Sequence, residues 1–122
     1  LRMQCRWMGN AQFLTRAFSM ANEDRTVLAG TQIIGWDPAA GIIRSWTFDS
    51  EGGFSEGVWN WQNDRWIVKA NAVMPDGSTG SEQRILTPQD QNRFTWKAVT
   101  RQVAGQLLPN AEEVAVVRVT HN

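Results

Sequence analysis

The chain has 122 residues, of which 42% are hydrophobic, and its 12 basic side chains are interspersed with 12 acidic ones. This length suits one domain with its own core, and the balanced charge argues against a nucleic-acid partner. Tyrosine is absent, the single cysteine cannot form an internal disulfide, and no run reaches the roughly 20 apolar residues of a membrane-spanning helix, so we expect no membrane partner.

Short runs rich in aromatic and β-branched residues follow one another along the chain, separated by glycine, proline, asparagine and aspartate. Such runs predict β-strands, and the turn residues between them predict hairpins that join consecutive strands. The predicted strands cover residues 1–8, 11–20, 26–36, 42–50, 54–62, 65–73, 78–87, 93–102 and 113–120.

The turns also predict how neighbouring strands pair. Residues 37–41 form a proline- and glycine-containing turn, residues 63–64 a two-residue turn, and residues 75–78 a four-residue turn. The predicted opposite pairs are Trp36 with Ile42, Trp61 with Trp66, Lys69 with Arg84, Asn71 with Glu82, and Ile85 with Trp96.

Because side chains alternate across a strand, this pairing sorts residues onto two faces. Burying an aromatic side chain is worth roughly 2–3 kcal/mol and burying an unpaired charge costs several, so an aromatic face should point inward and a mixed face outward. A slip of one residue at any turn would reverse the assignment beyond it. The aromatic face holds Ile33, Asp49, Trp59, Trp61, Trp66, Gln83, Phe94, Trp96 and Ala98. The mixed face holds Ile34, Trp46, Phe48, Phe54, Glu56, Lys69, Glu82, Arg84, Lys97 and Arg101.

Short strands in up-and-down order predict an all-β fold, an antiparallel meander of about 8–10 strands that closes into a barrel or half-barrel. An immunoglobulin-like sandwich competes, but it expects longer crossovers than these hairpins provide. The near-continuous apolar character of residues 113–120 suggests that the last strand is covered on both sides.

Short motifs run through most of the chain: Gly35-Trp36-Asp37-Pro38, Ile43-Arg44-Ser45-Trp46, Phe48-Asp49-Ser50, Gly52-Gly53-Phe54-Ser55-Glu56-Gly57, Arg65-Trp66-Ile67-Val68-Lys69-Ala70, Pro75-Asp76-Gly77, Phe94-Thr95-Trp96 and Arg101-Gln102. In these motifs the sequence resembles a bacterial lipocalin-like domain of unknown function. The resemblance implies one calycin-type, lipocalin-like β-barrel over residues 1–122. In that family the domain often follows a SnoaL-like domain, so the resemblance also implies a longer chain with an N-terminal partner domain. It names no reaction.

The aromatic face carries the first functional hypothesis. Its side chains either fill the barrel or line a pocket for a small apolar ligand, because small-molecule sites are usually aromatic with a few polar groups. The predicted pocket residues are Trp59, Trp61, Trp66, Gln83, Phe94 and Trp96.

A second aromatic cluster lies on the mixed face near the Gly52-Gly53 turn and consists of Trp46, Phe48 and Phe54. Exposed aromatic clusters usually mark a partner surface. We therefore expect this cluster to pack against a second copy of the chain, in a homo-oligomer, or against the missing N-terminal domain.

Asp49 is the one weak candidate for a catalytic residue, as a base in an aromatic cavity. The competing interpretation is that Asp49 caps the turn at residues 51–53. The only histidine, His121, adjoins the C-terminus, so we expect no catalytic triad, no metal site and no cofactor.

These observations favour a non-catalytic binding or accessory domain, which holds a small apolar ligand or docks a partner. One alternative is a cyclase-like or isomerase-like enzyme that uses Asp49 in an aromatic cavity. The other is a structural dimerisation module with a filled interior. The sequence leaves the cellular compartment open.

Overall fold

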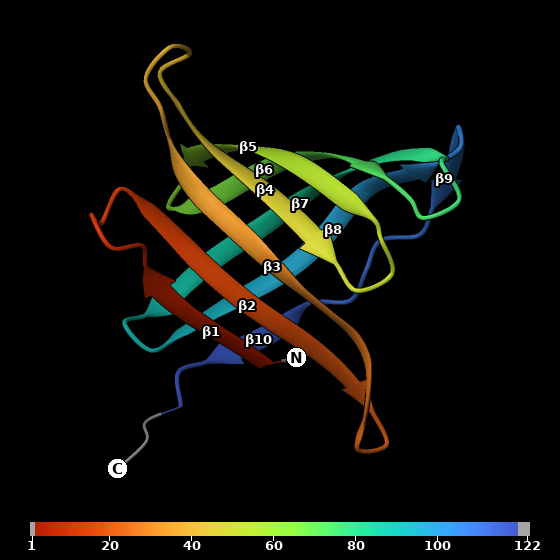
Figure 1. Ribbon diagram of the computed structural model, residues 1–122, viewed down its shortest axis with the longest axis horizontal. Helices are drawn as coiled ribbons and strands as arrows, with labels where there is room; N and C mark the ends of the chain where they lie inside the picture. Colours follow the sequence, from red (N-terminus) through yellow and green to blue (C-terminus); the bar gives the residue numbers. More distant parts are fainter. Residues whose placement is uncertain (1, 120–122) are drawn as a thin grey trace.

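The computed structural model describes residues 2–119, which form one sheet of ten antiparallel strands and no helix (Figure 1). Consecutive strands pair from β1 to β8, and β8 then pairs with both β9 and β10. The sheet curves, but β1 and β10 end the pairing order without pairing with each other, so its form is a half-barrel. The predicted all-β up-and-down meander is thus confirmed. The strands are β1 (Arg2–Trp7), β2 (Phe13–Asn22), β3 (Arg25–Asp37), β4 (Ile42–Asp49), β5 (Phe54–Gln62), β6 (Arg65–Val73), β7 (Thr79–Asp90), β8 (Arg93–Val103), β9 (Gln106–Leu108) and β10 (Val114–Val117).

The two-residue turn between β5 and β6 has the geometry that its sequence predicts. Asn63 and Asp64 have φ values of 53° and 62°, which are the left-handed conformations of a tight hairpin turn. This turn places Trp61 opposite Trp66, as predicted.

The turn between β3 and β4 is one residue shorter than predicted. Trp36 lies opposite Ile43 rather than Ile42. Since one residue of slip exchanges the two faces of a strand, Ile33 points to the outer side of the sheet and Ile34 to the inner side, the reverse of the prediction.

The turn between β6 and β7 is one residue shorter than predicted, because the Met74 N–H donates to the Ser78 carbonyl and closes the loop over residues 75–77. Asn71 lies opposite Ser81 rather than Glu82. This slip reverses the whole of β7, so Glu82 and Arg84 point to the inner side and Gln83 to the outer side.

A further slip between β7 and β8 offsets this reversal. Leu86, rather than Ile85, lies opposite Trp96. Phe94, Trp96 and the residues that alternate with them therefore stay on the inner side, where they were predicted.

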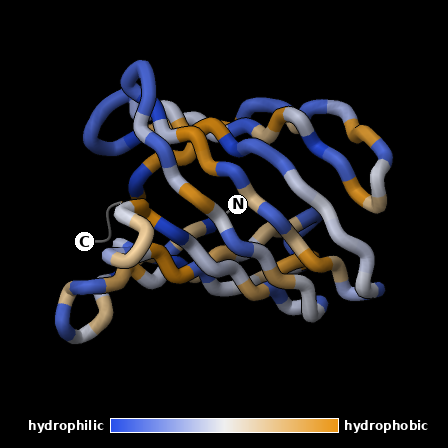
Figure 2. The backbone as a smooth tube through the Cα atoms, turned by 90° about the horizontal axis from the view of Figure 1, so that it is seen from above, coloured by the Kyte–Doolittle hydropathy of each residue, from blue (hydrophilic) through white to orange (hydrophobic). Residues whose placement is uncertain are grey.

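We call the concave side of the sheet the inner face and the opposite side the outer face. The most deeply buried side chains, apolar and polar alike, belong to the inner face, and in Figure 2 apolar and polar residues alternate along the strands. The buried side chains are Gln32, Ser45, Val68, Ala70, Leu86 and Ala98. The inner face of β4 to β8 consists of Ile43, Ser45, Thr47, Asp49, Ser55, Gly57, Trp59, Trp61, Trp66, Val68, Ala70, Ala72, Gly80, Glu82, Arg84, Leu86, Phe94, Trp96, Ala98, Arg101 and Val103.

The last strand is shorter and more open than its apolar sequence suggests. It covers Val114–Val117 and pairs only with β8. Val114 is 38% exposed and Val117 is 57% exposed, so the expectation that both sides of this strand are covered was wrong. The apolar run therefore marks an edge strand of the half-barrel.

Candidate functional site

Three indoles form a cluster on the inner face of β5 and β6. The ring centroid of Trp66 lies 5.8 Å from that of Trp59 and 5.1 Å from that of Trp61, with interplanar angles of 70° and 67°. This edge-to-face arrangement matches the positive edge of one ring to the negative face of another. Trp59 Nε1 also donates a hydrogen bond of 2.9 Å to Oγ of Ser45. The orientation of the cluster is thus defined by both stacking and hydrogen bonding.

The apolar surface continues from this cluster across β7 and β8 to β10. Trp96 lies opposite Leu86 on one side and Val114 on the other. Phe94 in β8 likewise lies directly opposite Val116 in β10. Both aromatic rings are half-buried. We call the directly opposite residues Trp61, Trp66, Leu86, Trp96 and Val114 the apolar row.

The inner face is not covered by a second layer of protein. The chain exposes 8723 Å², whereas a folded monomer of 13.8 kDa is expected to expose about 6,600 Å². Within residues 2–119 the buried apolar side chains comprise Val68, Ala70, Leu86 and Ala98, and Trp61 is 49% exposed. The aromatic surface of this site is therefore open to another molecule at Trp61, while Trp59, Trp66, Phe94 and Trp96 are half-buried.

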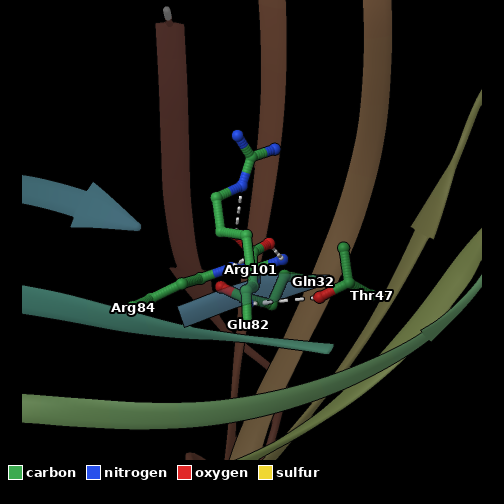
Figure 3. Close-up of polar contacts among 5 residues, drawn as sticks. All are labelled: Gln32, Thr47, Glu82, Arg84 and Arg101. Carbon is green, nitrogen blue, oxygen red and sulfur yellow. Dashed lines mark hydrogen bonds and ion pairs between the residues drawn. The ribbon is translucent and has the colours of Figure 1, made fainter. Parts of the chain in front are cut away.

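Polar side chains interrupt the apolar inner face in two places (Figure 3). On β7, Arg84 donates to Oε1 of Glu82 from Nε at 3.2 Å and from Nη2 at 3.0 Å. Arg101 in β8 approaches the same carboxylate, with its Nε 3.5 Å from Oε2. On the strands across the sheet, Gln32 Nε2 donates to Oγ1 of Thr47 at 3.2 Å. The inner face therefore offers charged groups beside its aromatic surface.

Sequence reasoning placed Glu82, Arg84 and Arg101 on the outer face, and all three are corrected by the structure. The first two follow from the shorter turn before β7. Arg101 is turned inward by a β-bulge, in which Thr100 and Arg101 together oppose Glu82. Thr100 has a φ of 50°. A glycine or asparagine would have signalled this bulge, but threonine rarely adopts that conformation, so the sequence carried no warning.

The structure separates Gln83 from the other predicted pocket residues. Gln83 lies opposite Lys69 on the outer face, because β7 is reversed. The remaining predicted pocket residues share the inner face, and they are Trp59, Trp61, Trp66, Phe94 and Trp96.

Asp49 belongs to the turn between β4 and β5. Its Oδ1 accepts hydrogen bonds from the backbone N–H groups of Glu51 at 2.9 Å and Gly53 at 3.0 Å. The backbone of Asp49 donates to the Gly53 carbonyl as well. This carboxylate is therefore occupied in holding the turn, which favours the structural interpretation over a catalytic base.

The predicted interface cluster lies on the outer face of β4 and β5. Phe48 and Phe54 are directly opposite each other, 52% and 49% exposed, while Trp46 is half-buried. A groove of about 400 Å³ begins at Phe54 and Glu56 in β5 and runs over β6 and β7. We call Phe48, Phe54 and this groove the outer patch.

Two other carboxylates, those of Asp37 and Asp76, accept hydrogen bonds within turns. Hydrogen bonds lower the pKa of Asp37, chiefly the one from the Ala40 backbone N–H, and the Ser78 hydroxyl lowers the pKa of Asp76. Among residues 2–119 no three acidic, cysteine or histidine side chains are grouped so that they could hold a metal ion. His121 lies outside the described residues.

No protein-family model matches the sequence, and no curated protein matches it. In the part of the chain that the structure describes, no helix is long and apolar enough to cross a membrane. The two surfaces of this chain with the chemistry to bind another molecule are the inner face with its apolar row and the outer patch.

Proposed function

We propose that this chain is a non-catalytic binding domain that holds a small apolar molecule against its inner face. The observation that carries the proposal is the indole cluster of the inner face, whose outermost ring, Trp61, is 49% exposed. The chain as a whole exposes 8723 Å², or about 2,000 Å² more than a compact monomer of its mass. Burial of apolar surface is worth roughly 25 cal/mol per Å². A ligand that covers even part of this surface gains affinity.

The engagement of Asp49 in its turn supports a non-catalytic role over the cyclase or isomerase alternative. A dimerisation module with a filled interior is less well supported, because Trp61 on the inner face is 49% exposed. The resemblance to lipocalin-like domains agrees with ligand binding and suggests the same placement of a ligand.

Titration with N-phenylnaphthylamine, a neutral apolar dye whose emission rises in apolar surroundings, tests the proposal. We expect a saturable rise in dye emission with energy transfer from tryptophan. Trp66→Ala removes the centre of the indole cluster and should weaken dye binding about tenfold or more. Trp46→Ala, which removes an outer-face indole, is the matched control and should leave dye binding unchanged.

Circular dichroism of both variants establishes that the sheet is retained. No saturable dye signal with the wild-type protein would overturn the proposal. Equal weakening by Trp66→Ala and Trp46→Ala, in two folded variants, would place the dye elsewhere and overturn it as well.

The outer patch supports a second function, which is self-association. Two directly opposite phenylalanine side chains, each about half exposed, lie beside a groove of about 400 Å³. Exposed aromatic residues of this kind are enriched at interfaces. We propose that a second copy of the chain covers this patch, leaving the inner face free for its ligand.

A further inference from the structure

The charges on the inner face where β7 and β8 meet do not cancel. Arg84 Nη2 lies 3.0 Å from Oε1 of Glu82, and Arg101 Nε lies 3.5 Å from Oε2. One carboxylate is thus shared by two guanidinium groups, which leaves one net positive charge. The side chains of Glu82 and Arg84 are each 23% exposed and that of Arg101 is 33% exposed, so water screens this charge only in part.

The two guanidinium groups also have N–H donors that are not used in these ion pairs, since each arginine carries five. Arg84 directs Nε and Nη2 at Glu82, and Arg101 directs Nη1 at the Pro109 carbonyl, 3.3 Å away. Within residues 2–119 these hydrogen bonds leave Nη1 of Arg84 and Nη2 of Arg101 without an acceptor. Carboxylates are the usual partners of paired guanidinium donors.

A recess of about 50 Å³ opens beside these donors. Its polar lining comprises Arg84 and Arg101 together with Glu82, Ser81 and Gln102, and its apolar lining includes Met74 and Leu108. The recess therefore has room for a small polar group such as a carboxylate.

Arg16 in β2 adds a further positive charge to the inner face. It lies opposite Gln32, and its Nε is buried without a hydrogen-bond partner among the described residues. A buried donor without a partner destabilises the fold, so an acceptor supplied by a ligand would be favourable there. The second inner-face carboxylate of β4 to β8, Asp49, is already bound to its turn. The inner face thus carries more guanidinium groups than carboxylates free to pair with them.

We propose that the molecule held on the inner face is an amphiphile with a single carboxylate, which lies against Arg84 and Arg101. Its apolar body lies along the apolar row, whose central residue, Leu86, is two residues or about 7 Å from Arg84 along β7. This inference rests on the proposed binding function and adds to it the charge of the ligand.

Displacement of N-phenylnaphthylamine by three molecules with the same apolar chain tests the head group. Dodecanoate is anionic at neutral pH, dodecanol is neutral and dodecylamine is cationic. We expect dodecanoate to displace the dye at about one tenth of the dodecanol concentration or less, and dodecylamine to be the weakest of the three.

Two substitutions should change this preference in opposite directions. Arg84→Gln makes the remaining pair with Glu82 neutral and should abolish the preference for dodecanoate over dodecanol. Glu82→Gln frees both guanidinium groups and should increase the preference. Arg44→Gln is the matched control, because Arg44 forms a comparable ion pair on the outer face, 3.2 Å from Asp37 with 27% of its side chain exposed.

The outcomes separate the two proposals. If the dye itself fails to bind, the proposed function falls and the head-group inference falls with it. If the dye binds and all three amphiphiles displace it equally, the binding function stands and the carboxylate site is overturned. Equal loss of dodecanoate affinity in Arg84→Gln and Glu82→Gln would also overturn it, because that result indicates a purely structural ion pair. If Arg84→Gln fails to fold, the Glu82→Gln result decides.

Discussion

The indole Nε1 of Trp59 donates a hydrogen bond to Oγ of Ser45 over 2.9 Å, and the serine is only 2% exposed. The two residues lie on neighbouring strands, and Gly57 directly faces Ser45 across the same strand pair. The absence of a side chain at Gly57 leaves room for the indole and the hydroxyl to meet. This contact orients the first ring of the indole cluster that we propose as the ligand surface.

Ser45→Ala should destabilise the fold by about 1–3 kcal/mol, because it leaves the partly buried indole N–H without its acceptor. Urea unfolding followed by far-ultraviolet circular dichroism measures this loss. In a Trp59→Phe background the same Ser45→Ala substitution should cost much less, since no indole donor remains. An equal cost in both backgrounds would show that the hydrogen bond contributes nothing to stability.

Gly57→Ala should destabilise the protein by about 1–3 kcal/mol through overpacking. A Cβ atom at this position would lie 2.6 Å from Oγ of Ser45 and 2.9 Å from Cγ1 of Val68. Gly9→Ala is the control, because nothing lies within 4 Å of a Cβ atom there. Thermal unfolding compares the two variants, and similar melting temperatures for both would contradict this account of packing at the inner face.

Sequence reasoning was most accurate where local chemistry determines the backbone. Asn63 and Asp64 are residues that tolerate left-handed conformations, so the turn and the pairing of Trp61 with Trp66 followed directly. Longer turns admit several lengths with the same composition. The turn before β7 is one residue shorter than its proline-to-serine segment indicates, and this difference of one residue places Glu82 on the other face.

The candidate site was predictable to the same degree. Indoles on β5 and β6 were placed correctly, because their register follows from the two-residue turn. Glu82, Arg84 and Arg101 were missed, because their sidedness depends on a turn length and on a bulge at Thr100 that has no sequence signal. An error of one residue is small for the fold, yet it reverses the charge of the binding surface.

Asp37→Asn should reduce stability above about pH 5 and have progressively less effect as the solution is acidified. Hydrogen bonding from the Ala40 backbone N–H, assisted by Ala39 and Arg44, holds the pKa of Asp37 below its ordinary value of 3.8. A carboxyl group whose pKa is lower in the folded state stabilises the fold while ionised, and this contribution is lost as the pH falls through the folded-state pKa. Melting temperatures of both proteins across the acid range measure the effect.

Arg44→Gln is the companion variant for this pH dependence. It should retain most of the dependence on Asp37, because the Ala40 hydrogen bond is the larger cause of the lowered pKa. A difference between wild type and Asp37→Asn that stays constant throughout the acid range would contradict the assignment.

Phe54→Glu should convert a self-associating protein to a monomer. Phe54 is 49% exposed and lies directly opposite Phe48 at the start of the outer groove, so the substitution would bury an unpaired carboxylate in the proposed interface. An unpaired buried charge costs several kcal/mol, which is enough to shift a dimerisation equilibrium by about a hundredfold or more. Sedimentation velocity over a range of protein concentrations measures the shift.

Val27→Glu provides the matched control, because Val27 is 53% exposed on β3 and does not line the outer patch. It introduces the same charge and should leave the sedimentation of the dimer unchanged. A wild-type protein that stays monomeric at every concentration would remove self-association as a function of the outer patch. Dye binding by the inner face would be unaffected, because the two surfaces lie on opposite sides of one sheet.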